Sequence, residues 1–134
     1  MIQKSLGTVL SAVSGSTVTP IGRLRAISEI RLTSEDMDVT ALDSPDGFRE
    51  YAQGVRDSGE VTVEGYYDSD NTGQTLLRTL YFSGASQTFK VVFPDESGVS
   101  FTAYVKSVSL GSARVDQPVA FAATLRITGK VTML

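Results

Sequence analysis

The sequence predicts a mainly β protein, an antiparallel β sandwich or barrel with one flanking α-helix, in a single domain that covers residues 1–134. Three observations support this fold class. Several segments alternate between apolar and polar residues, residues 94–98 form a turn between two such segments, and one stretch has helical spacing. A chain of 134 residues is long enough to bury a core without disulfides, which it cannot form because it has no cysteine.

The alternating segments are the expected strands. They cover residues 24–32, 60–64, 99–105 and 119–131, and in each of them every second residue is apolar or small. The five-residue turn at 94–98 joins residues 89–93 to the segment 99–105 as a hairpin. After Lys106 the apolar residues change parity, which indicates a β-bulge or a strand that passes from one sheet to another.

Helical spacing is found at about residues 72–83. The apolar residues with this spacing are Leu76, Leu77, Leu80 and Tyr81. Residues 70–72 supply N-cap candidates, and Gly84 ends the helix. The preceding residues 68–73 imitate the start of a calcium-binding loop, but the twelfth position is Thr79, where a bidentate glutamate is needed. We therefore interpret them as a capped turn before the helix.

Composition argues against an enzyme. The chain has neither histidine nor cysteine, so the commonest general base, the commonest metal ligand and thiolate chemistry are missing. No phosphate-binding glycine loop or nucleophile motif is present. Glu60 and Glu64 share a strand face with Thr62, which favours a solvated or channel-facing surface over a catalytic pair. We expect no catalytic residue, no metal and no cofactor.

Charge and hydropathy argue against a nucleic-acid-binding protein and against a membrane-spanning one. A net charge of −3 argues against binding nucleic acid by phosphate neutralisation, although DNA could slide past such a surface. A basic stripe of Arg23, Arg25 and Arg31 contains Glu29, so we interpret it as a polar sheet face or a salt-bridged subunit contact. No apolar run is long enough to span a membrane, and the run at residues 6–13 is short and interrupted. We expect no signal peptide and a protein made in the cytoplasm.

Residues 42–58 are the most unusual part of the chain. They form a long connection, rich in both charges and punctuated by proline and glycine, between a polar strand and an alternating one. Long ordered loops are disproportionately functional. Because no other segment carries chemistry, we expect this loop to contact another copy of the protein. A loop packed on its own sandwich is the alternative.

The same region resembles the lambda-like major tail tube proteins of long, non-contractile-tailed phages, which gives the fold class a tail-tube type. The residues that carry the resemblance are Leu42-Asp43-Ser44, Gly47-Phe48-Arg49-Glu50, Gly54 with Asp57, Gly59 and Glu60, then Gly73-Gln74 with Leu76-Leu77, the hairpin strand 101–106 and the closing segment 123–129. The resemblance therefore spans nearly the whole chain. The C-terminal immunoglobulin-like domain that decorates some tubes is not expected here.

The resemblance implies a structural protein that forms hexameric rings stacked into the hollow tail tube of a phage. The tube would enclose a tape-measure protein, contact tail terminator and tail-tip proteins, and conduct DNA into the host. It implies assembly in the host bacterial cytoplasm and a place in the virion tail, without a membrane. Alternatives are the tube protein of a contractile injection or type VI secretion machine, or a carbohydrate-binding sandwich, against which the absence of tryptophan counts.

Two sets of residues are the candidate sites. The expected subunit and ring contacts on the loop are Asp43, Phe48, Arg49, Glu50, Tyr51, Arg56 and Asp57. Phe48 and Tyr51 would be buried anchors, because aromatic and arginine side chains contribute most to interfaces. The tube lumen would be lined by one of two polar faces, and the sequence leaves the choice open. The candidates are Glu60, Thr62 and Glu64, or Asp36, Asp38 and Thr40.

Overall fold

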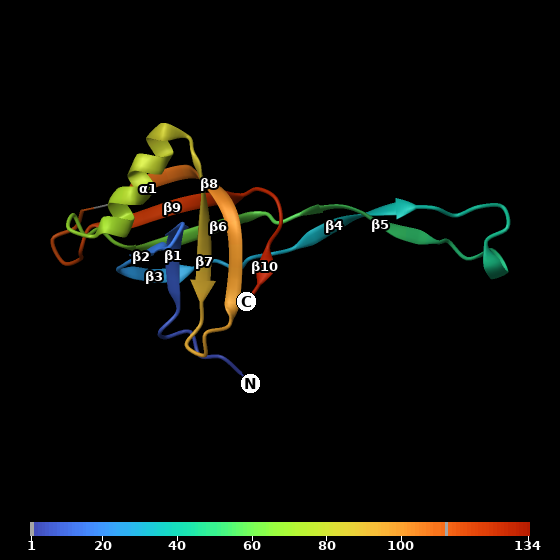
Figure 1. Cartoon of the computed structure of the whole chain (residues 1–134), viewed down its shortest axis with the longest axis horizontal. Coiled ribbons are helices and arrows are strands. Elements are labelled where there is room, and N and C mark those ends of the chain that lie inside the picture. Colours follow the sequence, from blue (N-terminus) through green and yellow to red (C-terminus); the bar gives the residue numbers. More distant parts are fainter. Residues whose placement is uncertain (1, 112) are drawn as a thin grey trace.

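The computed structural model describes residues 2–111 and 113–134 and shows a β-rich body from which a long, thin arm projects (Figure 1). The predicted fold class, antiparallel β with one flanking helix, is confirmed. The elements are β1 (Val9–Ser14), β2 (Thr17–Ile21), β3 (Leu24–Ile27), β4 (Thr33–Asp38), β5 (Tyr51–Asp57), β6 (Glu60–Tyr66), α1 (Thr72–Ser83), β7 (Ser86–Val92), β8 (Gly98–Leu110), β9 (Ala120–Ile127) and β10 (Thr132–Met133).

The body is one antiparallel sheet that folds over on itself. Its strand order is β2-β1-β7-β8-β9-β6-β3, and β10 adds to β8. The 13-residue β8 joins the two halves, because its first part pairs with β7 and its second part pairs with β9. The parity change after Lys106 is a register shift between Val105 and Ser107 in the β8–β9 pair.

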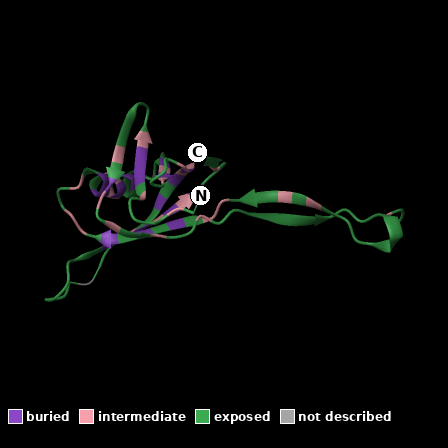
Figure 2. Cartoon of the chain, turned by 90° about the horizontal axis from the view of Figure 1, so that it is seen from below, coloured by how far each residue is buried: buried purple, intermediate pink, exposed green. Residues whose placement is uncertain are grey.

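The core lies between the two halves of the sheet. Its largest fully buried side chains are apolar except for Gln74, and Phe89 and Phe101 are stacked at a ring-centroid distance of 6.2 Å. The inward residues are those that the alternation in the sequence marks, as in β9, where Phe121 and Leu125 are fully buried. Figure 2 shows that the buried residues are confined to the body.

Helix α1 occupies the segment where the sequence places one, and the turn before it is capped as expected. The Asn71 side chain accepts a hydrogen bond from the backbone N–H of Gln74 at 3.1 Å, and Gly84 closes the helix with a left-handed φ of 72°. Leu77 and Leu80 are buried in the core. Neither α1 nor any other helical segment in the described ranges has the length and apolar character that crossing a membrane requires.

Gln74 fastens α1 to the body. Its side chain is fully buried, and its amide oxygen accepts from the backbone N–H of Asp68 at 3.0 Å. Its Nε2 donates to the carbonyl oxygens of Gly22 at 3.1 Å and Tyr66 at 2.9 Å. One side chain therefore joins the helix to the β2–β3 turn and to the end of β6.

The expected loop at residues 42–58 is a hairpin in the structure. Strand β5 occupies Tyr51–Asp57 and pairs with β4 in a separate two-stranded sheet, so the loop itself is limited to residues 39–50. The expected strand at 24–32 is also shorter, because β3 ends at Ile27 and the chain then leads into the arm. The arm strands have no core to impose alternation, whereas residues 28–30 still contact the body, through hydrogen bonds between Ser28 and Thr62 and the packing of Ile30 on the core.

Candidate functional site

The arm, residues 33–57, is a sheet without a core. All six residues of β4 are exposed, and β5 has only two half-buried positions. Figure 2 shows the arm exposed over almost its whole length. An isolated two-stranded sheet is at best marginally stable in water. The arm therefore gains little stability from burial within its own chain.

A hydrogen-bond network shapes the tip of the arm. Arg49 Nη1 donates to Asp38 Oδ2 at 2.9 Å, and Ser44 Oγ donates to Glu50 Oε2 at 2.9 Å. The backbone N–H of Glu50 in turn donates to Thr40 Oγ1 at 2.8 Å. The hydroxyl and backbone N–H of Thr40, followed by Arg49, hold the pKa of Asp38 below its ordinary value. Two expected contact residues, Arg49 and Glu50, therefore hold their own arm in shape.

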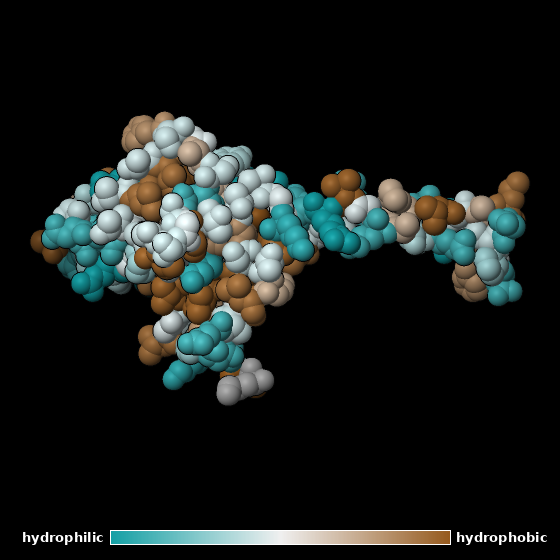
Figure 3. All heavy atoms as spheres, viewed as in Figure 1, coloured by the Kyte–Doolittle hydropathy of each residue, from teal (hydrophilic) through white to brown (hydrophobic). Residues whose placement is uncertain are grey.

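Apolar side chains at the tip point into solvent. Leu42 is fully exposed, Phe48 is 74% exposed and Tyr51 is 59% exposed. Figure 3 shows apolar side chains spaced along the arm and at its far end. The arm extends away from the sandwich (Figure 1), so the alternative of a loop packed on its own body is wrong. As anchors in a neighbouring subunit, Phe48 and Tyr51 stay a prediction.

The base of the arm is tied to the body by Asp57. Its carboxylate accepts from Arg126 Nη2 at 3.3 Å and from the backbone N–H of Gly59 at 2.9 Å. These contacts, the one with Gly59 first, lower the pKa of Asp57. Arg56 donates to Gln53 at 3.1 Å on the same strand. Asp57 thus orients the arm.

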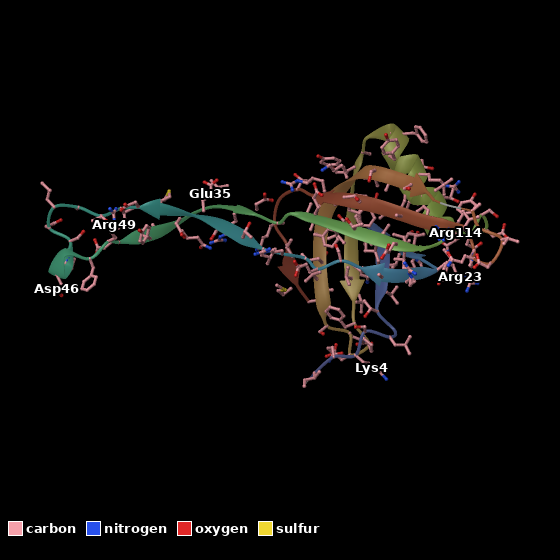
Figure 4. All side chains as sticks on the ribbon, turned by 180° about the vertical axis from the view of Figure 1, so that it is seen from behind. Lys4, Arg23, Glu35, Asp46, Arg49 and Arg114 are labelled. Carbon is pink, nitrogen blue, oxygen red and sulfur yellow. The ribbon has the colours of Figure 1, made fainter. Side chains whose placement is uncertain are left out.

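Two of the arm acids without an ion pair are at its far end. Asp43 and Asp46 form no ion pair with any residue that the structure describes. Figure 4 shows Asp46 at the end of the arm, beyond Arg49 and far from the body. Asp46 and Gly47 both have positive φ, 56° and 74°, and make the turn that exposes Phe48.

The first candidate lumen face is a charge-balanced surface on the body. Glu60 is ion-paired with Lys106 across the sheet, and this hydrogen bond lowers the pKa of Glu60. Glu64 lies 3.8 Å from Arg25. Each carboxylate on this face of β6 therefore has a cation beside it, and the face presents no excess negative charge.

Thr62 lies between the two glutamates on this face, and its hydroxyl is 3.4 Å from the hydroxyl of Thr124. The expected basic stripe contributes to the same pattern of pairs, because Arg23 lies 3.4 Å from Asp68. The second candidate set, with Asp36 and Asp38, lies on β4 in the arm. The two candidate linings therefore belong to different sheets.

Charge is divided unequally between arm and body. The arm holds seven of the fifteen acidic residues and two of the twelve basic ones, so it carries −5 and the rest of the chain carries +2. The sequence total of −3 conceals this separation. An acidic arm and a basic body attract each other when they come from different copies.

A known protein family is similar to this chain in sequence, and solved structures are similar to it in fold. The family described as lambda phage tail tube protein (TTP) matches residues 2–133. The chain is similar in structure to the tail of an empty gene transfer agent particle, solved with C6 symmetry, with a TM-score of 0.78, 22% identity and coverage of 99% of each chain.

Two further structures share the fold. The anti-feeding prophage baseplate gives a TM-score of 0.75 at 12% identity, covering 100% of this chain and 97% of that one. The SPP1 tail tube gives 0.64 at 17% identity, covering 91% of this chain and 72% of that one. No curated protein matches the chain in sequence. The family match covers nearly the whole chain, and the chain belongs to the lambda phage tail tube protein family.

Proposed function

We propose that this tail tube protein forms hexameric rings that stack into the hollow tail tube of a phage, the conduit through which DNA is ejected into the host. The observation that carries the proposal is the arm: a preformed hairpin of 25 residues, counted over residues 33–57, with exposed apolar side chains and no core. Such a segment is stabilised only when a neighbour covers it.

The body supplies the second requirement for a ring. Strands β2 and β3 stand at the two ends of the strand order, and each leaves an outer edge unpaired within residues 2–111 and 113–134. Closing the sheets of several copies into one barrel removes such edges. A heterologous contact of this kind closes into a ring by rotation, and stacking extends the ring into a filament.

The arm is the natural bridge between copies. Phe48 and Tyr51 act as apolar anchors, with Asp43 as a free charge beside them, whereas Arg49, Glu50 and Asp57 hold the arm rigid. Rigidity before binding reduces the entropy lost when the contact forms. We assign the bridging role to the whole hairpin of β4, β5 and the loop between them.

In this proposal the lumen is lined by the face of β6 that carries Glu60, Thr62 and Glu64, where each glutamate is ion-paired. Balanced ion pairs leave no cation free to hold a phosphate, so DNA passes without being retained. The arm residues Asp36 and Asp38 are the alternative lining. They are less suited to that role because they lie on the arm, which is the part of the chain that bridges copies in this proposal.

We infer the remaining partners from the tube itself. A tape-measure protein fills the lumen before ejection, and tail terminator and tail-tip proteins cover the two ends. Assembly takes place in the cytoplasm of the bacterial host, and the role is structural rather than enzymatic. The likeness to the anti-feeding prophage baseplate leaves the tube of a contractile injection or type VI secretion machine as the second candidate, and the presence of a sheath would identify it.

Negative-stain microscopy of the purified protein tests the proposal. We expect rings or hollow filaments from the unmodified chain, and none or far fewer from the double variant Phe48→Ala with Arg49→Ala. The matched control is Phe82→Ala, which removes a phenylalanine that is 86% exposed on α1 rather than on the arm. Tubes of normal length from the double variant contradict the role of the arm, and a chain that stays monomeric at high concentration contradicts the tube.

A further inference from the structure

A groove of about 790 Å³ opens on the body at the end where the chain begins. Its walls come from residues 5–8, from β3 and the residues after it, and from the β7–β8 hairpin. The apolar side chains that matter are Leu6, Leu24, Ile27, Ile30 and Phe93. Figure 3 shows apolar side chains gathered on this end of the body. The volume is of the size that binds a few large side chains.

Two residues of the groove wall are unfavourably placed in the isolated chain. Leu6 is 86% exposed at its mouth, although leucine side chains gain from burial. On the same wall, Thr8 Oγ1 is buried and has no hydrogen-bond partner among the described residues. A buried hydroxyl without a partner is unfavourable. Apolar side chains that enter the groove would cover Leu6, whereas the Thr8 hydroxyl is already shielded from solvent.

The arm tip of another copy has the properties that the groove requires. Leu42 and Phe48 project from a tip whose backbone is already fixed, and the acids Asp43 and Asp46 lie beside them. The arm projects away from the body of its own chain (Figure 1), so a contact between its tip and the groove would form between copies. The arm carries −5 and the rest of the chain +2, so attraction between the two parts favours the same pairing.

Basic residues stand near the groove. Arg25 lines it and is held by Glu64 only at 3.8 Å, and Lys4 directly precedes the wall formed by residues 5–8. Figure 4 shows Lys4 at this end of the body. Lys4 and Arg25 offer cations to Asp43 and Asp46 when the tip enters, although the groove lining also includes the acidic Glu29.

We propose that this groove is the receptor for the arm tip of a neighbouring subunit, with Leu42 and Phe48 inserted between Leu6, Ile30 and Phe93. The inference rests on the proposed function, because it supposes that copies assemble through the arm. It adds the surface that receives the arm, and it makes each subunit both donor and acceptor in a repeating head-to-tail contact.

Thiol crosslinking tests the contact, because the chain has no cysteine of its own. One variant carries Leu42→Cys, and a second, size-tagged variant carries Leu6→Cys. The two are mixed, assembled and treated with a short bis-maleimide. We expect a mixed dimer of the two sizes as the main product. The matched control replaces Leu42→Cys by Phe82→Cys, an equally accessible site on α1, and should give only background.

A second measurement does not depend on crosslinking. Leu6→Asp should raise the critical concentration for tube formation by about tenfold or more, since burial of a leucine side chain is worth at least that factor. The unfolding of the monomer should be unchanged, because Leu6 is exposed there. Dimers through Phe82→Cys but not through Leu42→Cys, or an unchanged critical concentration, overturn the groove assignment and leave the tube intact. An unmodified chain that forms no tube overturns both.

Discussion

Replacing Gln74 by methionine should destabilise the body by about 3 kcal/mol, because it removes three hydrogen bonds at once and leaves their backbone partners unpaired, each at a cost of about 1 kcal/mol. The partners are the N–H of Asp68 and the carbonyls of Gly22 and Tyr66, at 3.0, 3.1 and 2.9 Å. Methionine has a similar length and no strong hydrogen-bonding atom, so packing changes little. The loss in the free energy of unfolding therefore reports the three hydrogen bonds and not a change in packing.

Circular dichroism at rising temperature or urea concentration measures this effect. A loss of about 3 kcal/mol lowers the melting temperature of a domain of this size by roughly 10 °C, and it leaves the protein folded at 25 °C if the total stability is about 5–15 kcal/mol. The control is Gln117→Met, which changes an exposed glutamine in the β8–β9 connection. A shift below about 1 kcal/mol for Gln74→Met would refute the reasoning, since water would then be replacing the lost contacts.

Gln74→Glu tests the direction in which stability changes with pH. The carboxylate keeps an acceptor for Asp68 but faces the two carbonyl oxygens of Gly22 and Tyr66, which raises its pKa in the folded state. A group whose pKa is raised on folding favours the folded state at low pH and loses that contribution as pH rises above its unfolded value. This variant should therefore be closer to the parent in acid and weaker near neutral pH, whereas a pH-independent loss would contradict the assigned contacts.

Three further predictions follow from other contacts. Gly73→Ala places a Cβ 2.4 Å from a β2 carbonyl oxygen, so α1 must shift and denaturant unfolding should show a loss of about 1–3 kcal/mol; unchanged stability contradicts this packing. Charge reversal at both Glu60 and Glu64 frees cations on the paired face and should slow DNA ejection from normally assembled tails, whereas unchanged ejection removes these residues from the lumen. Because the pKa of Asp38 is lowered in the folded state, its ion pair and hydrogen bonds stabilise the fold above the ordinary pKa of 3.8, and this stabilisation is lost as pH falls through the folded-state pKa. The amide resonance of Thr40 should report that step in an NMR titration. A step at the ordinary pKa would contradict the network.

The sequence predicts β6, β8 and β9 because each of them has one face on the core, whereas β1, β2 and β10 have no counterpart among the predicted strands. In β9 every second side chain must avoid water, so the alternation appears in the sequence and the structure follows it. Strand β4, with the sequence TSEDMD, has solvent on both faces, so nothing imposes a period of two. The sequence therefore predicts a polar strand before the loop but not its partner β5, which falls inside the expected loop at residues 42–58.

The residues of the candidate site could be located from the sequence, but their separate roles could not. Arg49 reads as a contact residue until the pairing of β4 with β5 brings Asp38 beside it, and that pairing contains a register shift between Ser34 and Asp36. Gln74 was missed as an anchor, although a signal was present: it falls on the same helix face as Leu77, where a polar side chain is unusual. Partners distant in sequence define both roles.

The separation of charge and apolar surface bears on how the proposed assembly would proceed. Arms that carry −5 repel one another, so the exposed Leu42 and Phe48 of two free copies are kept apart. A body that carries +2 attracts the same arm, and the apolar contact then holds it. In the proposed head-to-tail contact, each added subunit would bring both a preformed arm and a groove, so every addition would leave one of each free for the next copy. Such a contact would let an existing ring or stack be extended without a further conformational change in the arm.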